Sequence, residues 1–389
     1  MNKYLRILIT VALLIGLAIV LLWLTGNKHI LRGIPLTFLQ GETKPDIDDM
    51  EHFDLRPIES GKGEAWAVKH LPAGPSIAQD YEDRWEKYGN CAMLVIVHDT
   101  IRYERYWDGY DEHTYSNSFS MAKSMTSMAV GVAMDEGLIA GPQAKLGDYV
   151  PAFAEGLNSE LTIEHLLTMS SGIDYGESYS DPFGYQAKAY YGRDLEGETM
   201  RYGVAKKPGE EWKYEGGNTV LLSLALEEAT GKKLSEYFSE KIWSKIGAEQ
   251  DAFWNLDDAG GLEKSFSAVY ASARDYARLG QLVLDSGRWH GQQLISEEYL
   301  KNAWTPVHIP DPEGKDVVNY GWQWWLGEYE GHPFASCRGM RGQYIVPLPH
   351  LDAVIVRLGH DRPSEVMDGM TLDLQWNLEF ATRLAQELD

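Results

Sequence analysis

Residues 118–127 read Ser-Phe-Ser-Met-Ala-Lys-Ser-Met-Thr-Ser, and the rest of the chain is organised around them. The stretch contains the single Ser-x-x-Lys of the sequence, formed by Ser120 and Lys123. On a helix, residues three apart project from the same face, so we expect these side chains to lie together. A nearby lysine can take the proton of a serine hydroxyl and make it a nucleophile. The same spacing is also typical of a helix-capping serine followed by a solvated lysine, so spacing alone does not identify a catalytic pair.

Composition excludes several classes of function. The formal net charge of −23 argues against a nucleic-acid partner, which requires a basic face. A hydrophobic content of 44% over 389 residues indicates a globular protein of one large domain or two. The two cysteines, Cys91 and Cys337, cannot build a metal cluster or a disulfide framework. We interpret them as structural thiols, with one bridge as the alternative, and we predict neither a metal nor a cofactor.

The N-terminal segment predicts a membrane anchor. Residues 7–25 are apolar, and no charge lies between Arg6 and Lys28, which is close to the length that spans a bilayer. Lys3 and Arg6 precede the run, so the positive-inside rule places the remainder of the chain outside the cytoplasm. We predict an uncleaved anchor over residues 1–27 in the inner (cytoplasmic) membrane, with a single pass and a periplasmic or extracytoplasmic catalytic domain. A cleaved signal peptide is the alternative.

Strand patterns occur at both ends of the remaining chain and helical patterns between them. Residues 28–75 predict a tether and lead-in, because residues 41–51 are acidic and lack an apolar period, and a polar helix is expected over 76–89. The predicted strands cover residues 92–97, 101–107, 320–325, 334–338, 344–347 and 353–358. One predicted helix starts at Ser120 and ends at Gly137, and the others cover residues 162–172, 219–230, 234–246, 267–286 and 371–388. Residues 173–205 form an irregular, tyrosine-rich segment, which we expect to be an ordered wall.

This order, without β-α-β alternation, predicts an α+β fold. An antiparallel sheet flanked by terminal helices would be built from residues 76–115 and 287–389, and a helical part from residues 116–286 would be inserted into it. Together they would form one domain over residues 76–389, preceded by the transmembrane helix. Ser120 would lie where the two parts meet, and clefts form at such junctions.

Five ordered motifs resemble the serine β-lactamases and penicillin-recognising hydrolases. The resemblance is closest to the class C β-lactamase-like esterases and the 6-aminohexanoate-dimer (nylon oligomer) hydrolases. The motifs are residues 120–124, 166–172, 208–214, 270–278 and 339–343. The resemblance covers about residues 75–385 and implies a β-lactamase-like fold.

The resemblance also implies roles for particular residues. Ser120 would be the nucleophile, Lys123 its base, and Tyr214 of the second motif a proton shuttle within hydrogen-bond reach of both. The backbone N–H groups of Ser120 and Met340 would stabilise the oxyanion, and Met340 lies in the third motif with Gly339, Gly342 and Gln343. We expect no metal in this site.

The substrate-binding half departs from the family pattern. In β-lactamases the second motif reads Tyr-x-Asn, whereas here it is Tyr214-Glu215-Gly216, and Asn218 follows two residues later. Cys337-Arg338-Gly339 replaces the Lys-Thr-Gly of β-lactamases, so that Arg338 or Arg341 would have to hold a substrate carboxylate. Tyr175, Asn218, Arg338 and Arg341 are therefore the candidate substrate-binding residues.

The sequence thus predicts a membrane-anchored serine hydrolase that cleaves small carboxylic esters or amides through an acyl-enzyme on Ser120. Two alternatives remain open. One is a D-amino acid peptidase or carboxypeptidase acting on peptidoglycan, and the other is a penicillin-binding-like sensor module that turns over nothing.

Overall fold

The computed structural model describes residues 2–41, 44–367 and 369–388. Residues 42 and 43 of the predicted tether lie outside this range. The helices are α1 Lys3–Leu24, α2 His29–Leu36, α3 Gly74–Ala78, α4 Glu82–Lys87, α5 Met121–Asp135, α6 Ile163–Leu167, α7 Tyr185–Tyr191, α8 Leu195–Thr199, α9 Gly216–Thr230, α10 Leu234–Phe238, α11 Ala273–Leu284, α12 Glu297–Ala303 and α13 Leu372–Ala385. The strands are β1 Leu55–Ile58, β2 Ala67–Val68, β3 Asn90–Val97, β4 Thr100–Tyr106, β5 Ser116–Asn117, β6 Ala252–Asn255, β7 Val269–Ala271, β8 Arg288–Trp289, β9 Gln292–Gln293, β10 Ile309–Pro310, β11 Asp316–Val317, β12 Trp325–Tyr329, β13 His332–Gly339, β14 Gln343–Leu348, β15 Ala353–Gly359, β16 Val366–Met367 and β17 Met370–Thr371.

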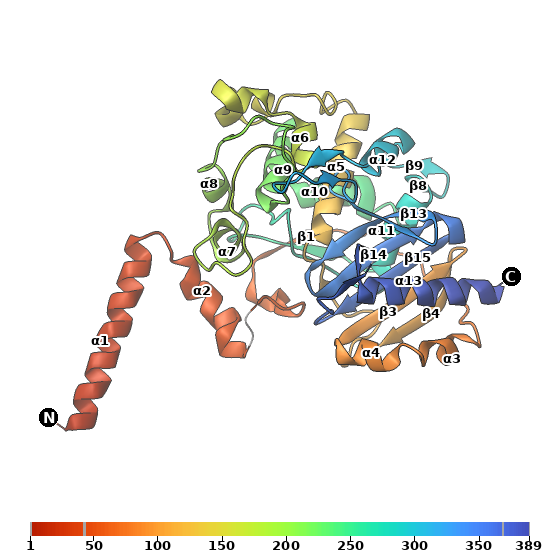
Figure 1. The fold of residues 1–389 in the computed structure, drawn as a ribbon, viewed down its shortest axis with the longest axis horizontal. Coiled ribbons are helices and arrows are strands. Elements are labelled where there is room, and N and C mark those ends of the chain that lie inside the picture. The colour runs from red at the N-terminus through yellow and green to blue at the C-terminus, as the bar shows by residue number, and fades with distance from the viewer. Residues whose placement is uncertain (1, 42–43, 368, 389) are drawn as a thin grey trace.

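Seven strands form the main sheet, in the order β12-β13-β14-β15-β3-β4-β2. Neighbouring strands run antiparallel, except that β2 runs parallel to β4. The first long strand of the chain lies beside the last, since β3 pairs with β15 and Val95 faces Ile355. This topology confirms the predicted α+β architecture, in which early and late strands close one sheet around a helical insertion (Figure 1).

Strand β3 shows how helices cover both faces of the sheet. All eight of its residues are buried, as expected for a strand without a solvent-facing side. Alternate side chains point to opposite faces of a strand. Leu94 joins the apolar cluster that includes α5 and α11, whereas its neighbour Val95 joins the cluster that includes α13. Helix α13 crosses one face of the sheet, with α3 and α4 near the same edge (Figure 1).

Helix α5 passes between the sheet and the helical part. Its residues 121–133 are all buried, and it packs against α9, α10 and β13. Hydroxyl groups inside the core hold it in register: Ser124 Oγ donates to the Gln323 carbonyl at 2.7 Å, and Thr126 Oγ1 donates to the Ser265 carbonyl at 3.0 Å. The first residues of α5 are therefore fixed from several sides.

The helical part contains a second sheet, which the sequence patterns did not predict. Its four strands have the order β1-β6-β7-β5, and β5 lies directly before the Ser-x-x-Lys stretch. The helix predicted over residues 267–286 was therefore placed too early. Val269–Ala271 is strand β7, and α11 begins only at Ala273, where Ser272 Oγ caps it by accepting from the Asp275 N–H at 3.2 Å.

Other predicted boundaries also need correction. The strand predicted at residues 320–325 begins only at Trp325, because Gln323 has a φ of +65° that interrupts an extended chain. The helix predicted over 76–89 is two short helices, α3 and α4. The segment 173–205 is less irregular than expected, since it contains α7 and α8 and buries the Tyr190 side chain.

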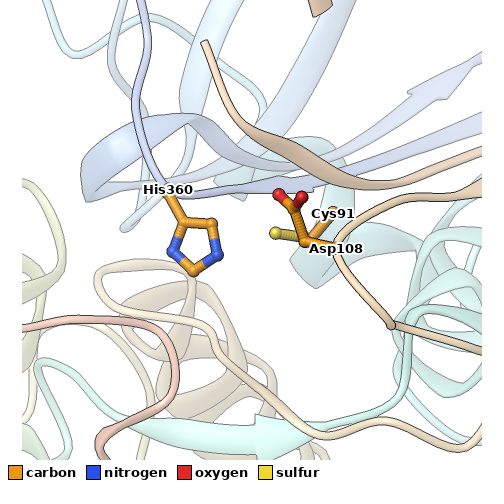
Figure 2. A group of neighbouring side chains, drawn as sticks. All are labelled: Cys91, Asp108 and His360. Carbon is orange, nitrogen blue, oxygen red and sulfur yellow. The ribbon is translucent and has the colours of Figure 1, made fainter. Parts of the chain in front are cut away.

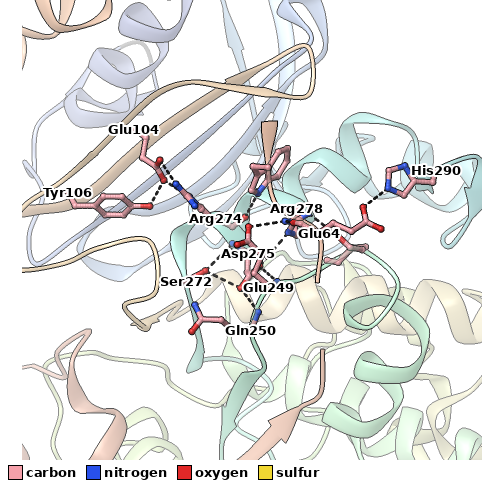
Figure 3. Close-up of polar contacts among 12 residues, drawn as sticks. Glu64, Glu104, Tyr106, Glu249, Gln250, Ser272, Arg274, Asp275, Arg278 and His290 are labelled. Carbon is pink, nitrogen blue, oxygen red and sulfur yellow. Dashed lines mark hydrogen bonds and ion pairs between the residues drawn. The ribbon is translucent and has the colours of Figure 1, made fainter. Parts of the chain in front are cut away.

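Helix α11 is anchored by the charged residues of the Ala-Arg-Asp-Tyr-Ala-Arg motif (Figure 3). The guanidinium of Arg274 donates two bonds to the Glu104 carboxylate on β4, at 2.7 and 2.8 Å. The Asp275 carboxylate accepts from the Glu249 N–H at 2.8 Å. Arg278 donates to the Glu249 carboxylate at 3.1 Å and also to the Glu64 carbonyl. This motif therefore joins α11 to β4 and to two loops, which makes its role structural.

The segment predicted as a tether packs on the domain instead. Helix α2 lies against α7, and the Gly33 backbone approaches the Tyr191 ring so closely that a Cβ there would lie 3.3 Å from it. Arg32 donates to the carbonyls of Gly192 and Asp257, at 3.2 and 2.9 Å. Strand β1 then enters the small sheet. In contrast, no residue of α1 is buried, and this helix projects away from the domain (Figure 1).

Candidate active site

Ser120 lies at the N-terminus of α5, and Lys123 lies one turn further along the same face. Lys123 Nζ is 3.1 Å from Ser120 Oγ, so the two side chains are in hydrogen-bond contact. Strands β5 and β7 fix the preceding backbone, because the Ser118 N–H donates to the Val269 carbonyl at 2.7 Å and Ser118 Oγ accepts from the Val269 N–H at 3.0 Å. The small sheet thus positions the nucleophile candidate.

Phe119, the residue before Ser120, has a φ of +44°. A non-glycine residue in this region costs roughly 1–3 kcal/mol and persists only where its surroundings hold it. Here the Asn117 side chain does so, since its Oδ1 accepts from the Phe119 N–H at 2.8 Å. Within the described residues, the Ser120 N–H donates no hydrogen bond, which leaves this group free to bind an oxyanion.

Lys123 is only 1% exposed, and its side-chain nitrogen is held by a carbonyl and aromatic rings. Nζ donates to the Phe266 carbonyl at 2.8 Å and lies 4.8 Å from the centre of the Tyr214 ring. Across the described chain, no carboxylate forms an ion pair with Lys123. A buried amine that shares no carboxylate partner is suited to exchange a proton with Ser120.

Tyr214 reaches this centre through its ring. It belongs to an aromatic cluster in which its ring centre lies 5.9 Å from that of Tyr320 and 5.3 Å from that of Trp325. Within the part of the chain that the structure describes, no hydrogen bond joins its hydroxyl to Ser120 or Lys123. The predicted proximity to Lys123 is therefore present, whereas the predicted hydrogen bonds to both residues are absent from this conformation.

The departure at Gly216 has a steric cause. A Cβ on Gly216 would lie 3.1 Å from the Phe266 ring, and a Cβ on Gly217 would lie 2.3 Å from the Tyr175 ring. A side chain at position 216 would therefore press on Phe266, which sequence patterns did not single out and which also supplies the carbonyl that binds Lys123. Because Phe266 is far from Lys123 in the sequence, no local sequence pattern indicates this contact.

The third motif closes over the start of α5. Gly339 ends β13, and a Cβ there would lie 2.2 Å from the Ser118 carbonyl oxygen, so only glycine fits this approach. Gly342 has a φ of +81°, and a Cβ there would meet the Arg357 guanidinium at 2.2 Å. Gln343 secures the turn, because its Nε2 donates to the Met340 and Gly359 carbonyls at 3.1 and 2.7 Å.

The four candidate substrate-binding residues do not line the cavity beside Ser120. Tyr175 is 2% exposed and packs against Tyr185, with ring centres 4.6 Å apart. Asn218 is 1% exposed and points its amide at Met169, with Nδ2 3.4 Å from Sδ. Both are core residues in this structure.

The two arginines are also engaged elsewhere. Arg338 donates to Ser336 Oγ at 2.8 Å and lies over the Trp325 ring, and burial lowers the pKa of its guanidinium to about 10. Arg341 donates to the Pro45 carbonyl at 2.9 Å and the His360 carbonyl at 2.6 Å. Arg341 therefore braces the lead-in segment against the third motif.

A cavity of about 450 Å³ opens directly beside the nucleophile candidate. Ser120, Phe119, Ser267 and Met340 line one end of it. Helices α2 and α7 and the loop that precedes α7 supply most of the remaining lining. This volume is typical of small-molecule sites in proteins. Sequence patterns did not indicate that α2 belongs to the site.

His360 lies in a separate polar cluster with Cys91 and Asp108 (Figure 2). Potential ligand atoms of these three residues lie within 4.8 Å of one another. The His360 ring also contacts Asp46, with Nδ1 2.9 Å from Oδ1. The Asp46 hydrogen bond and the neighbouring Cys91 raise the pKa of His360 to about 10. Because the His360 ring contacts Asp46 of the lead-in segment, we interpret this cluster as a charged link to that segment.

Comparison with known families agrees with this arrangement. A family model described as Beta-lactamase matches residues 77–378. The chain belongs to this family. The 6-aminohexanoate-dimer hydrolase of Paenarthrobacter ureafaciens is 29% identical over 314 residues, which cover 75% of this chain and 78% of that protein.

Two solved structures share the fold of this chain. A Bacillus anthracis protein assigned as a 6-aminohexanoate-dimer hydrolase has a TM-score of 0.74 at 20% identity, covering 87% of this chain and 92% of that chain. A family VIII carboxylesterase has a TM-score of 0.64 at 17% identity, covering 81% of this chain and 98% of that chain. The predicted family and enzyme class are thus confirmed: the protein is a serine hydrolase of the beta-lactamase family.

Proposed function

We propose that this enzyme hydrolyses carboxylic esters or amides through an acyl-enzyme on Ser120. The contact between Lys123 Nζ and Ser120 Oγ at 3.1 Å, at the end of a 450 Å³ cavity, carries this proposal. The family relatives named for amide and ester hydrolysis support it.

Each step of acyl transfer has a candidate group. Ser120 Oγ attacks the substrate carbonyl carbon, and its proton passes to Lys123 Nζ. The carbonyl oxygen becomes an oxyanion that accepts bonds from the Ser120 and Met340 N–H groups. A proton then reaches the leaving group through Tyr214, and the bond to the leaving group breaks. Water completes the cycle by attacking the acyl-enzyme with the same proton path in reverse.

The N-terminal helix supports a membrane location. Helix α1 has 22 residues, is long and apolar enough to cross a bilayer, and buries none of them in the domain. We propose that it anchors the enzyme in the cytoplasmic membrane as a single pass. The positive charges of Lys3 and Arg6 favour a domain on the extracytoplasmic side.

Substitution of the nucleophile tests the proposed activity. We expect Ser120→Ala to lower kcat for p-nitrophenyl butyrate by at least about 10³-fold, because no other group can form the acyl-enzyme. Ser124→Ala is a matched control, since Ser124 lies on the same helix and donates to the Gln323 carbonyl rather than to Ser120. Equal turnover by Ser120→Ala and the wild type would refute the assignment.

A further inference from the structure

The cavity beside Ser120 extends to the segment that joins the domain to the apolar helix α1. Helix α2 contributes His29, Ile30, Gly33 and Ile34 to its wall, and Thr37 and Phe38, which follow the helix, also line it. One continuous space therefore connects the nucleophile candidate to the membrane-proximal part of the chain.

The wall formed by α2 is held in place. His29 Nε2 lies 2.8 Å from the Pro182 carbonyl oxygen, and Gly33 packs on the Tyr191 ring. Burial lowers the pKa of the His29 imidazole, which favours its neutral form. Because α2 is docked and not free, its distance from Ser120 is a fixed property of the fold.

The membrane end of the cavity lies close to α1. Helix α1 ends at Leu24 and α2 begins at His29, so their ends are separated by at most about 18 Å of extended chain. The real path is shorter, since the Asn27 N–H donates back to the Leu22 carbonyl at 2.7 Å. If α1 spans the bilayer, the cavity wall starts at the level of the lipid headgroups.

Large apolar side chains are exposed around this end of the cavity. Phe38 and Tyr179 line the cavity and are also 66% and 57% exposed, so they mark its mouth. Their neighbours Leu39 and Phe183 are 74% and 53% exposed. On a chain with a net charge of −23, an apolar group beside an anchor is typical of a surface that enters the membrane interface.

The lining favours an apolar chain over a charged substrate. Ile30, Ile34, Phe38, Ala187 and Tyr190 present carbon to the space. Two charged side chains, Lys44 and Asp181, belong to the lining, whereas Arg338 and Arg341, the candidates for holding a carboxylate, are absent from it. A substrate that reaches Ser120 through this cavity would therefore bury a hydrocarbon chain along α2 and α7.

We propose that the substrate is an amphiphilic ester or amide whose hydrocarbon chain enters this cavity from the membrane interface. The inference rests on the proposed function, because it uses Ser120 as the reacting group. It adds a substrate class and assigns α2 as a specificity element.

Chain-length preference tests the apolar subsite. We would reconstitute the full chain in phosphatidylcholine vesicles and measure kcat/KM for p-nitrophenyl acetate, butyrate and octanoate. A fully buried methylene should raise kcat/KM about fourfold, so burial of only two of the four methylenes that octanoate adds to butyrate should raise kcat/KM at least tenfold. Ala187→Trp fills part of the cavity that α7 lines and should lower the octanoate-to-acetate ratio at least tenfold. Leu157→Trp, on an exposed site outside the lining, should keep the wild-type ratio.

A second pair of variants tests the route from the membrane and does not depend on repacking the cavity. Phe38→Ser with Leu39→Ser should lower turnover of vesicle-dissolved p-nitrophenyl dodecanoate, relative to acetate, at least tenfold. The matched control is Val366→Ser with Met367→Ser, which removes equally exposed apolar side chains outside the cavity lining. Unchanged ratios in Ala187→Trp and in the Phe38–Leu39 variant would overturn the inference.

Ser120→Ala on acetate, in the same vesicles, separates the two proposals. If that variant loses acetate turnover while the wild type shows no chain-length preference, the proposed function stands and the lipid-facing cavity is refuted. If that variant keeps acetate turnover, the proposed function itself fails.

Discussion

Gly339→Ala is the most direct test of how the third motif positions the oxyanion site. The added Cβ would lie 2.2 Å from the Ser118 carbonyl oxygen, whereas ordinary contact begins at 3.4 Å. The end of β13 and the start of α5 must therefore part by about 1.2 Å. A displacement of about 1 Å in a catalytic group can lower the rate about 10²-fold. Overpacking of this kind also lowers the free energy of unfolding by about 1–3 kcal/mol.

We expect Gly339→Ala to lower kcat/KM for p-nitrophenyl butyrate about 10²-fold while the protein stays folded, as judged by circular dichroism and a two-state urea transition. Gly331→Ala is the matched control at the other end of the same strand. It has a φ of +81°, and nothing lies within 4 Å of its added Cβ, so it should lose stability without losing activity. A Gly339→Ala enzyme within threefold of the wild type would refute the positioning argument.

The other predictions concern the proton path, a charged link and the motif on α11. Tyr214→Phe keeps the ring beside Lys123 but removes the hydroxyl, so kcat should fall about 10²–10⁴-fold while the melting temperature changes little. An unchanged rate in a p-nitrophenyl ester assay would remove Tyr214 from the mechanism. The Asp46 hydrogen bond raises the pKa of His360 to about 10, so the contribution of His360 to the free energy of unfolding is complete below pH 6.5 and is lost as pH rises through 10. After allowance for solvent screening, urea unfolding should show that the free energy of unfolding falls by about 1–2 kcal/mol over this range. The His360→Gln variant should lack this fall. Arg274→Met leaves the Glu104 carboxylate buried without its partner and should lower the unfolding free energy by about 3–5 kcal/mol, whereas adding Glu104→Gln should recover part of the loss; equal losses in the single and double variants would contradict this.

The architecture was predictable because its strands and helices carry strong local signals. Residues 92–97 are a continuous apolar run, and the two residues between β3 and β4, His98 and Asp99, both adopt positive φ as a tight hairpin requires. Ser120 and Lys123 were predictable because three-residue spacing on a helix fixes their relative position.

The substrate half of the site depended on tertiary packing, which leaves little trace in local sequence. Phe266 binds Lys123 from a position more than 100 residues away, and no pattern around it indicates that contact. Tyr175 was expected at the cavity because a tyrosine-rich loop is typical of a binding wall, yet its ring fills the space that Gly217 leaves open. Short strands such as β5 and β7 also escaped prediction, since two or three residues cannot establish an alternating pattern.

The bracing of the third motif by residues 44–49 has a practical consequence for anyone who trims this protein. A soluble fragment starting at residue 76, the boundary that sequence patterns suggested, would lack the Pro45 carbonyl that Arg341 holds and the Ile47 carbonyl that accepts from the Asn117 N–H at 3.0 Å. It would also lose strand β1, an edge of the small sheet that carries the backbone before Ser120. The shortest useful fragment therefore removes the apolar helix α1 alone and begins at α2.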